Sequence, residues 1–249
     1  MTFHDHFSAQ APAYGRARPH YPDELLAHLA RLAPARDLAI DVATGNGQAA
    51  VGLARHFDQV LAGDASATQL AAAVTHPRVQ YVCLRAESLP IGRAVADLVT
   101  AAQAAHWFEL DRFYAEVRRV LRPGGVVALW TYGMLAVDPA CDRVLRNFYR
   151  ARVGRHWPPQ RRYVEEGYRT LPFPFAALSA PTFELAAEYT LEELVDYVGT
   201  WSAVARCRQL EGVDPLPELA RDLLPVWRGA SHRTVRWPLH LLIGQAVPI

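Results

Sequence analysis

Short apolar runs alternate with segments of helical periodicity over the first half of the chain. The apolar runs predict strands near 38–43, 59–63, 79–83, 96–101 and 126–131. The segments between them predict helices near 47–56, 67–74 and 111–121. Because the first strands are almost continuously apolar, they are typical of a parallel sheet that helices cover on both faces.

The pattern changes at both ends of this alternating core. A proline followed by two acids predicts the start of a helix at Pro22. After Trp130 the chain becomes rich in arginine, aromatic residues and proline, so we expect the stretch 138–181 to be an insertion. Further strands are predicted at 182–189 and 235–247, with helices at 190–206 and 215–228 between them.

These elements predict one α/β domain with a doubly wound, Rossmann-like sheet of seven strands. A chain of 249 residues, half of them apolar, suits a single large domain. Pro238 interrupts the last strand and predicts an edge or a bulge there. We expect an N-terminal lid and helix at 1–35 and a cofactor-binding core at 36–131. An arginine-rich helical cap at 132–181 is expected between strands five and six, and the segment 182–249 is expected to complete the sheet.

Composition and charge exclude several classes of protein. The net charge of +1 gives no overall attraction to nucleic acid or membrane. All 26 basic residues are arginine, so no lysine can form a Schiff base or act as a general base. The three cysteines are scattered, so we expect neither a disulfide framework nor a metal site. The first residues hold no hydrophobic signal core, and we expect a soluble, cytoplasmic protein that is a monomer or a homodimer.

The most informative motif lies where the first predicted strand ends. Between Asp41 and Gly47 two glycines follow an apolar run, which predicts a tight turn from strand to helix. Such a turn holds the pyrophosphate in dinucleotide-binding proteins, but the carboxylate of Asp41 would repel one. S-adenosylmethionine (SAM) carries a sulfonium and an ammonium and no phosphate. Asp64 ends the next apolar run, where it could accept hydrogen bonds from ribose hydroxyls, so the pattern favours SAM.

Further motifs follow in the order found in a known family. Asp41-Val-Ala-Thr-Gly-Asn-Gly47 and Asp64 precede Ala86-Glu-Ser-Leu-Pro90, Ala102-Gln-Ala-Ala-His-Trp-Phe108 and Leu121-Arg-Pro-Gly-Gly125. This series resembles the class I SAM-dependent methyltransferases, and within them the small-molecule branch that includes trans-aconitate and cantharidin methyltransferases. Residues 7–14 and 18–22 are similar to the N-terminal lid of that branch. The wider class usually has glycine in place of Ala43, and alanine fits there if its φ is negative.

The resemblance implies a role for each position in these motifs. The turn with Asp41 would hold the methionine part of SAM, Asp64 would bind the ribose, and Glu87 would lie near the adenine amine. Gln103 and its neighbour would face the methionyl carboxylate and sulfur, and the lid would close over the cofactor. The implied cofactor residues are Tyr14, Arg18, Asp41, Ala43, Thr44, Gly45, Gly47, Asp64, Ala65, Ala86, Glu87, Gln103 and Ala104.

Candidate substrate residues lie after the fourth strand and in the insertion. Residues 142–169 hold eight arginines against three acids. The cluster 156–162 combines aromatic, proline and guanidinium groups, which suit the recognition of a carboxylate or a phosphate. We therefore expect a small, anionic acceptor, while Trp201 is expected in the core. The predicted substrate residues are Trp107, Tyr132, Trp157, Arg161 and Arg162.

His106 is the candidate catalytic residue, because it follows the fourth strand at the edge where open α/β sheets bind ligands. If the methyl acceptor is a hydroxyl, a phenol or an amine, histidine suits the base that takes its proton near neutral pH. If the acceptor is a carboxylate, no base is needed. Arg161 or Arg162 would then position it, and His106 would only shape the pocket. We expect transfer to oxygen, and carbon or nitrogen acceptors stay open as alternatives.

Three other functions compete with methyl transfer. A non-catalytic SAM-binding or regulatory protein would share the cofactor residues, although the predicted cap and lid favour an active site. A nicotinamide-dependent oxidoreductase is disfavoured by Asp41 and by the lack of a Tyr-x-x-x-Lys pair. A nucleic-acid methyltransferase would show Asn/Asp-Pro-Pro-aromatic after the fourth strand, where this chain has Ala102-Gln-Ala-Ala105.

Overall fold

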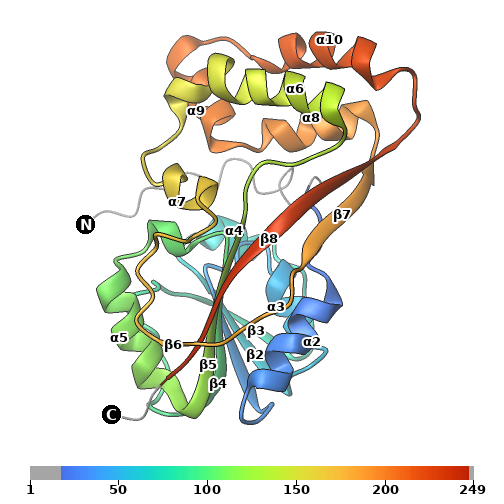
Figure 1. Ribbon diagram of the computed structural model, residues 1–249. Coiled ribbons are helices and arrows are strands. Elements are labelled where there is room, and N and C mark those ends of the chain that lie inside the picture. The colour runs from blue at the N-terminus through green and yellow to red at the C-terminus, as the bar shows by residue number, and fades with distance from the viewer. Residues whose placement is uncertain (1–17, 247–249) are drawn as a thin grey trace.

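The structure, a computed structural model, describes residues 18–246 and contains one mixed sheet. Its strands follow the order β3-β2-β1-β4-β5-β8-β6, and β7 pairs with β8 outside this path (Figure 1). Neighbours among β1 to β5 are parallel, and β8 is antiparallel to β5. The strands are β1 (Leu38–Val42), β2 (Gln59–Asp64), β3 (Val79–Cys83), β4 (Ala96–Ala102), β5 (Leu121–Tyr132), β6 (Ala176–Ala177), β7 (Glu184–Tyr189) and β8 (Arg233–Gln245).

Helices cover both faces of the sheet and form a separate layer beyond its upper edge (Figure 1). The sheet is flanked by α2 (Asp23–Leu32), α3 (Gln48–Leu53), α4 (Ala67–Ala71), η2 (Ala105–Trp107) and α5 (Leu110–Val120). We call the remaining helices the cap. It consists of α6 (Pro139–Asn147), η3 (Phe148–Arg152), η4 (Gly154–His156), α7 (Arg161–Glu165), α8 (Leu191–Gly199), α9 (Ser202–Glu211) and α10 (Leu216–Trp227).

Alternation along the strands divides the core into two apolar clusters, one on each face of the sheet. In β5, Val126, Ala128 and Trp130 pack into the cluster that includes α2 and α3. Val127 and Leu129 pack into the cluster that includes α5. Because successive side chains of a strand point to opposite faces, a strand buried on both faces must be apolar throughout. The continuous apolar runs in the sequence have this origin.

The long strand β8 joins the sheet to the cap. Its C-terminal half pairs with β5, from Gln245 opposite Val126 to Leu239 opposite Tyr132. Its N-terminal half pairs with β7, beginning at Pro238. Pro238 therefore lies where β8 changes its partner, a place that tolerates a residue without a backbone N–H. In Figure 1, β8 runs as one diagonal strand from the sheet into the cap.

The cap is built from two stretches of the chain, whereas the sequence predicted one insertion at 132–181. Helices α8 and α10 pack together, and α10 also contacts α6. The segment 182–249 thus supplies cap helices as well as strands. The predicted helix 190–206 is broken at Thr200, whose hydroxyl donates to the carbonyl of Tyr197 at 2.6 Å. The chain is extended at Trp201 before α9 begins.

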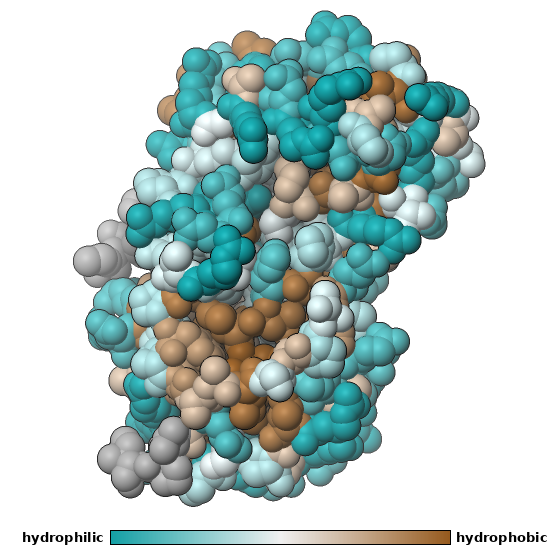
Figure 2. All heavy atoms as spheres, viewed as in Figure 1, coloured by the Kyte–Doolittle hydropathy of each residue, from teal (hydrophilic) through white to brown (hydrophobic). Residues whose placement is uncertain are grey.

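The last strands also differ from the prediction. The predicted strand 182–189 is β7, which pairs only with β8, so it does not extend the main path of the sheet. The edge strand next to β8 is instead β6. It has only two residues, too few for an alternation of apolar and polar residues to be recognised in the sequence. In the view of Figure 2, hydrophilic residues cover most of the cap, and apolar residues gather over the strands below it. None of the helices among residues 18–246 has the length and apolar composition needed to cross a membrane.

Candidate functional site

The carboxyl ends of β1 to β4 lie side by side at one edge of the sheet, because these strands are parallel neighbours. Asp41 of β1 is paired with Ala62 of β2 and with Thr100 of β4. The order of strands along the chain reverses between β1 and β4, and open α/β sheets bind ligands in the crevice at such a switch point. The motifs at 41–47, 64, 86–87 and 103–104 therefore meet at this edge.

Asp41 lies beneath the turn, with 1% of its surface exposed. The Thr100 hydroxyl donates to its Oδ1 at 2.7 Å, and the Thr44 hydroxyl donates to its Oδ2 at 2.6 Å. Burial raises the pKa of Asp41 to about 6, and the charge of Asp64 adds to this, although the two threonine hydrogen bonds oppose it. A cation bound nearby would stabilise the ionised form of Asp41.

The turn after Asp41 contains three residues in the left-handed region. Ala43, Gly45 and Gly47 have φ values of 55°, 57° and 86°. The condition under which alanine would fit at position 43, a negative φ, is therefore not met, and the Cβ of Ala43 costs about 1 kcal/mol in this conformation. A Cβ added to Gly45 would meet only one atom within 4 Å, so this face of the turn is open. A Cβ added to Gly47 would lie 2.1 Å from the Tyr81 hydroxyl, so packing against β3 requires glycine there.

Asp64 is held in one orientation beside the turn. The backbone N–H of Gly45 donates to its Oδ2 at 2.9 Å, and the N–H of Ser66 donates to its Oδ1 at 2.8 Å. The N–H of Thr44 donates to the carbonyl of Gly63 at 2.9 Å, which ties the turn to the end of β2. A carboxylate oxygen can accept more than one hydrogen bond, so these backbone contacts are compatible with a bond from a ligand hydroxyl.

Ala86 and Glu87 follow β3 at the same edge. The Glu87 side chain is 12% exposed and lies 3.7 Å from the Arg85 guanidinium. Its Oε1 accepts a hydrogen bond from the N–H of Glu109 at 3.1 Å, at the start of α5. Protein contacts therefore fix Glu87, and its contact with adenine stays a prediction. Ala86 is buried, and Ala65, after β2, is half-buried.

Gln103 directly follows β4, has a φ of 56°, and is bonded to β5 through both the nitrogen and the oxygen of its side-chain amide. Its Nε2 donates to the carbonyl of Tyr132 at 2.9 Å, and the Thr131 hydroxyl donates to its Oε1. Both bonds come from β5, so the neighbouring strand sets the orientation of this amide. Ala104, the next residue, is 8% exposed.

The residues at this edge fit SAM. Asp41 and Asp64 lie at the ends of β1 and β2, and Glu87 follows the neighbouring β3. The turn 43–47 contains no cationic side chain. A phosphate group would be repelled by the first two carboxylates, whereas an ammonium and ribose hydroxyls would be attracted. The open face at Gly45 lets a ligand approach the backbone closely.

A cavity lies between this edge and the cap. It brings together predicted residues from four parts of the chain, namely Arg18, Gln103, His106, Trp107, Tyr132, Trp157 and Arg161. The same cavity is also lined by Gly133, Pro158, Val164, Tyr197, Thr200, Trp201 and Ser202. No acidic side chain is among the described residues that line it.

Arg18 enters the cavity from the N-terminal segment. Its Nη1 donates to the Tyr132 hydroxyl at 2.8 Å, and its Nε donates to the Thr200 hydroxyl at 3.2 Å. Its guanidinium carbon lies 5.8 Å from the ring centre of Tyr132 and 5.1 Å from that of Tyr197. Two aromatic rings therefore hold a positive charge against the cavity wall. Tyr14, the other predicted lid residue, lies outside the described residues.

Arg161 brings a second guanidinium to the cavity, from the start of α7. Its guanidinium carbon lies 4.4 Å from the ring centre of Trp157 and 5.4 Å from that of Tyr149. Its Nε donates to the Tyr149 hydroxyl at 2.8 Å. Within residues 18–246 no carboxylate forms an ion pair with Arg161. The sequence missed Tyr149, although it belongs to the same aromatic and arginine-rich stretch.

Two predicted placements differ from the structure. Arg162 does not line the cavity; it stacks over Tyr163 at 4.8 Å and faces an outer hollow. This happens because adjacent residues of a helix point in different directions. Trp201 is 6% exposed, as a core residue would be, but it also lines the cavity. The break between α8 and α9 brings it there, a feature with no clear signal in the sequence.

His106 forms part of the cavity wall in the short helix after β4. Its ring centre lies 4.9 Å from that of Trp107, and its Nδ1 lies 2.9 Å from the Tyr168 hydroxyl. Burial lowers the pKa of His106 to about 3, and the positive charge of Arg161 contributes. A group with this pKa is neutral at pH 7 and binds a proton weakly, which disfavours the predicted role as a general base.

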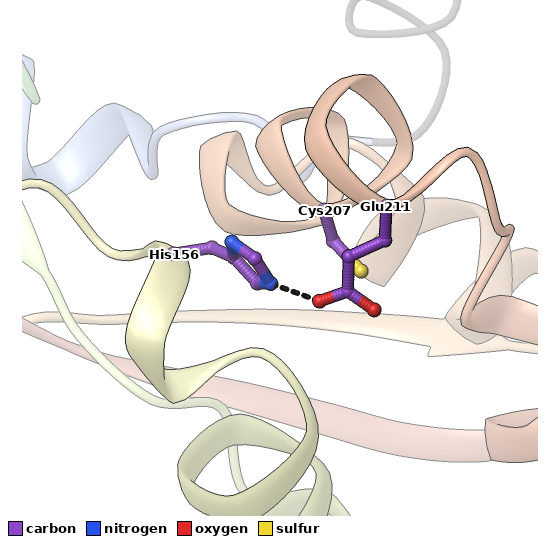
Figure 3. Close-up of side chains that lie close together, drawn as sticks. All are labelled: His156, Cys207 and Glu211. Atoms are coloured by element: carbon purple, nitrogen blue, oxygen red, sulfur yellow. Dashed lines mark hydrogen bonds and ion pairs between the residues drawn. The ribbon is translucent and has the colours of Figure 1, made fainter.

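An ionic cluster of the cap includes His156 and Glu211, with Cys207 close to both (Figure 3). The Nε2 of His156 lies 2.5 Å from Oε1 of Glu211, and Cys207 lies close enough for all three to share a metal ion. However, Arg155 donates to Glu211 at 2.6 Å, and Arg152 donates to Glu211 at 3.2 Å and to Cys207 at 3.5 Å. Arg155, His156 and Arg152 lower the pKa of Glu211 to about 2. Protein cations thus already neutralise this carboxylate, and the cluster joins η4 to α9.

Comparison with known proteins gives consistent matches over this chain. Residues 40–129 match the family model described as a methyltransferase domain. A protein of Dictyostelium discoideum named as a methyltransferase is 30% identical over 98% of this chain and 95% of its own. A structure from Anaeromyxobacter dehalogenans, titled a type II methyltransferase, is 45% identical with a TM-score of 0.86 over 93% of this chain and 99% of its own. The malonyl-[acyl-carrier protein] O-methyltransferase of Enterobacter lignolyticus is 36% identical over 57% of this chain and 59% of its own.

The strained residue Ala43 gives a prediction about stability. Because alanine at positive φ is unfavourable, we expect Ala43→Gly to raise the free energy of unfolding by about 0.5–1 kcal/mol. Urea unfolding followed by circular dichroism measures this. Ala115→Gly, at an exposed position within α5, is the matched control and should lower stability by about 0.5–1 kcal/mol. The same sign for both variants would contradict strain at Ala43.

The raised pKa of Asp41 makes the stability of the protein without cofactor depend on pH. The native state holds this proton more tightly than the unfolded chain does. The stabilisation that the bound proton gives to the native state is therefore complete below about pH 4 and is lost as the pH rises through about 6. Asparagine does not titrate, so the difference in unfolding free energy between Asp41→Asn and the natural protein should shift in favour of the variant as the pH rises. We expect this shift to reach up to about 3 kcal/mol between pH 4 and pH 7.5. Urea unfolding at both pH values tests this, and a difference independent of pH would contradict it.

Proposed function

We propose that this chain, which belongs to the class I SAM-dependent methyltransferases, transfers a methyl group to a carboxylate oxygen of a small organic anion. Membership of the family follows from the match over nearly the whole length of the Dictyostelium relative, and the chain is therefore a SAM-dependent methyltransferase. The proposal concerns the acceptor and the residues that hold it.

The charge of the cavity is the observation that carries the proposal. Two guanidinium groups, Arg18 and Arg161, line it, and no acid is among its described lining residues. Both groups stack on aromatic rings, which hold a cation in place. A carboxylate entering this cavity would gain charge-assisted hydrogen bonds, whereas a cationic acceptor would be repelled.

The relatives support the same class of acceptor. The Enterobacter relative is named for O-methylation of a malonyl group, which carries a free carboxylate. The N-terminal motif resembles the branch of trans-aconitate and cantharidin methyltransferases, and we place this chain in that branch. We also propose that the N-terminal segment 1–35 includes a lid ahead of α2, since Arg18 contacts Tyr132 and Thr200 across the cavity.

A carboxylate acceptor agrees with the cavity wall, in which no strong base is found among the described lining residues. SAM, when bound, supplies a methyl group on a sulfonium, which makes it electrophilic. The acceptor oxygen is already ionised at pH 7, so His106 does not need to take a proton. We assign the protein three tasks, which are to orient the carboxylate through Arg161 and Arg18, to align it through the aromatic walls, and to exclude water.

The cofactor part of the proposal is tested by binding. Isothermal titration should show SAM binding with a dissociation constant on the order of micromolar, and no binding of NAD or NADP. Asp64→Asn removes the negative charge of the side chain that we propose binds the ribose, while the amide oxygen of the new side chain still accepts one backbone N–H. We expect it to weaken SAM binding at least about tenfold. Asp58→Ala, at an exposed position just before the opposite end of β2, is the control and should bind like the natural protein.

The proposed acceptor is tested by substituting, one at a time, two adjacent arginines. Radiolabelled SAM and a panel of small mono-, di- and tricarboxylic acids identify the best acceptor. With that acid, Arg161→Gln should raise KM about 10- to 100-fold, because a charge-assisted hydrogen bond is lost. Arg162→Gln, whose side chain faces away from the cavity, should change KM less than about threefold. Methylation of uncharged alcohols or amines but of no acid would overturn the proposal.

A further inference from the structure

A second hollow adjoins the cavity at the start of α7. Its described lining residues all lie between 149 and 165, and we call it the outer hollow. Trp157, Pro158 and Arg161 line both the cavity and the outer hollow, so the two spaces meet along these side chains. A molecule bound in the cavity can therefore extend past this shared wall into the outer hollow.

The two spaces differ greatly in size. The cavity has a volume of about 60 Å³, which is room for only a few water molecules. The outer hollow has a volume of about 410 Å³. The cavity can thus hold a carboxylate and the atoms next to it, whereas the rest of a longer acid needs the second space.

Four of the residues that line the outer hollow present apolar surface. The ring centres of Tyr149 and Trp157 lie 4.8 Å apart with their planes 34° from parallel, and Pro158 and Pro159 continue the same wall. The ring of Trp201 packs against that of Trp157 at 5.7 Å. Aromatic rings and prolines change conformation little on binding, so this wall offers an apolar group a preformed surface.

The backbone builds this wall from a rare turn. The segment η3 is a π-helix, in which the N–H of Val153 donates to the carbonyl of Phe148 at 3.1 Å. Such single π-turns occur frequently at functional sites. Here the π-turn and the tighter helix η4 lead the chain from Tyr149 to Trp157, so that the two rings come into contact.

The charged side chains at the outer hollow do not form a second anion site. Arg162 stacks over Tyr163, and its Nη2 donates to the Tyr163 hydroxyl at 3.1 Å. Arg150 is exposed to solvent. Glu165 accepts a hydrogen bond from the Tyr149 hydroxyl at 2.5 Å, and its negative charge would repel an anionic group bound beside it. The outer hollow therefore suits an uncharged body better than a second carboxylate.

We propose that the acceptor is a carboxylic acid with an apolar body, which places its carboxylate in the cavity and its body in the outer hollow. This inference rests on the proposed function, in which Arg161 orients the carboxylate. The Arg161 guanidinium stacks over Trp157 at 4.4 Å, in the wall that the two spaces share. The cavity then selects the charge of the acceptor, and the outer hollow selects its length and apolar character.

A series of acids of increasing length tests the proposal. Methyl transfer from radiolabelled SAM is measured with straight-chain monocarboxylic acids from acetic to decanoic acid, at concentrations below micelle formation. Once the chain reaches the outer hollow, each added methylene should lower KM about two- to fourfold, because apolar surface is buried. A KM that stays constant or rises along the whole series would overturn the proposal.

A substitution that fills the outer hollow shows where the body lies. Gly154 lines the outer hollow and is not among the described residues of the cavity, and a Cβ added to it would meet only the Tyr149 carbonyl, at 3.5 Å. Because leucine there occupies the space of several methylenes, Gly154→Leu should raise KM for decanoic acid at least about tenfold. For the shortest acid that is methylated, KM should change less than about threefold. An equal change for both acids, or none for decanoic acid, would contradict the proposal.

Gly92→Leu is the matched control. Gly92 is an exposed residue before β4, and a Cβ added to it would meet only Val95, at 3.7 Å. This variant should leave KM for both acids unchanged. If circular dichroism shows that Gly154→Leu is not folded, Arg150→Trp fills the outer hollow from an exposed position of η3 and should give the same result.

A binding measurement separates this inference from the proposed function. Isothermal titration with S-adenosylhomocysteine present, which has no methyl group to transfer, should show that decanoate binds the natural protein at least about tenfold more tightly than Gly154→Leu. If decanoate binds in this way but no acid is methylated, only the proposed function fails. If short acids are methylated and decanoate binds both proteins equally, only the inference fails.

Discussion

The parallel pairing of β1 with β2 and β4 is the constraint on which the rest of this structure depends. It places Asp41 opposite Ala62 and Thr100, so that three strands end at the same height. Turns that are far apart in the sequence then form one edge, where Thr100 and Thr44 can satisfy the buried carboxylate. Without this register Asp41 would be an unpaired buried charge, which costs several kcal/mol. The acidic edge that fits SAM is thus a consequence of strand pairing.

The acceptor cavity depends on a second connection, between the sheet and the cap. The strand β8 belongs to both, because it pairs with β5 at one end and with β7 at the other. The cluster of His156, Glu211 and two arginines then fixes η4 to α9, beside Trp157. Trp201, which precedes α9, packs against Tyr149 and Trp157, the two rings on which Arg161 stacks. A cation stacked in this way keeps its charge available to an anion, which is the basis of the proposed specificity.

Three of the five described non-glycine residues with positive φ lie near the same edge. Ala43 lies in the turn after Asp41, Gln103 lines the cavity, and Tyr168 contacts His106 of the cavity wall. Each is held by neighbours, such as the bonds from β5 to Gln103 or the packing of Gly167 against His240. Strain at such positions is stable only because the surrounding elements are already fixed by the sheet. Strained backbone conformations thus occur at positions where a side chain must take one orientation.

The sequence by itself determined the α/β alternation, the five parallel strands and the glycine turn, because these follow from local periodicity and turn chemistry. It also identified Arg161 and His106, which the structure places in one cavity. Only the tertiary structure decided that Arg162 faces outward, that Trp201 reaches the cavity and that Tyr168 bonds His106. These facts depend on how helices of the cap are broken and packed against β8. Contacts between segments distant in the chain leave no periodic signal, so no local pattern could reveal them.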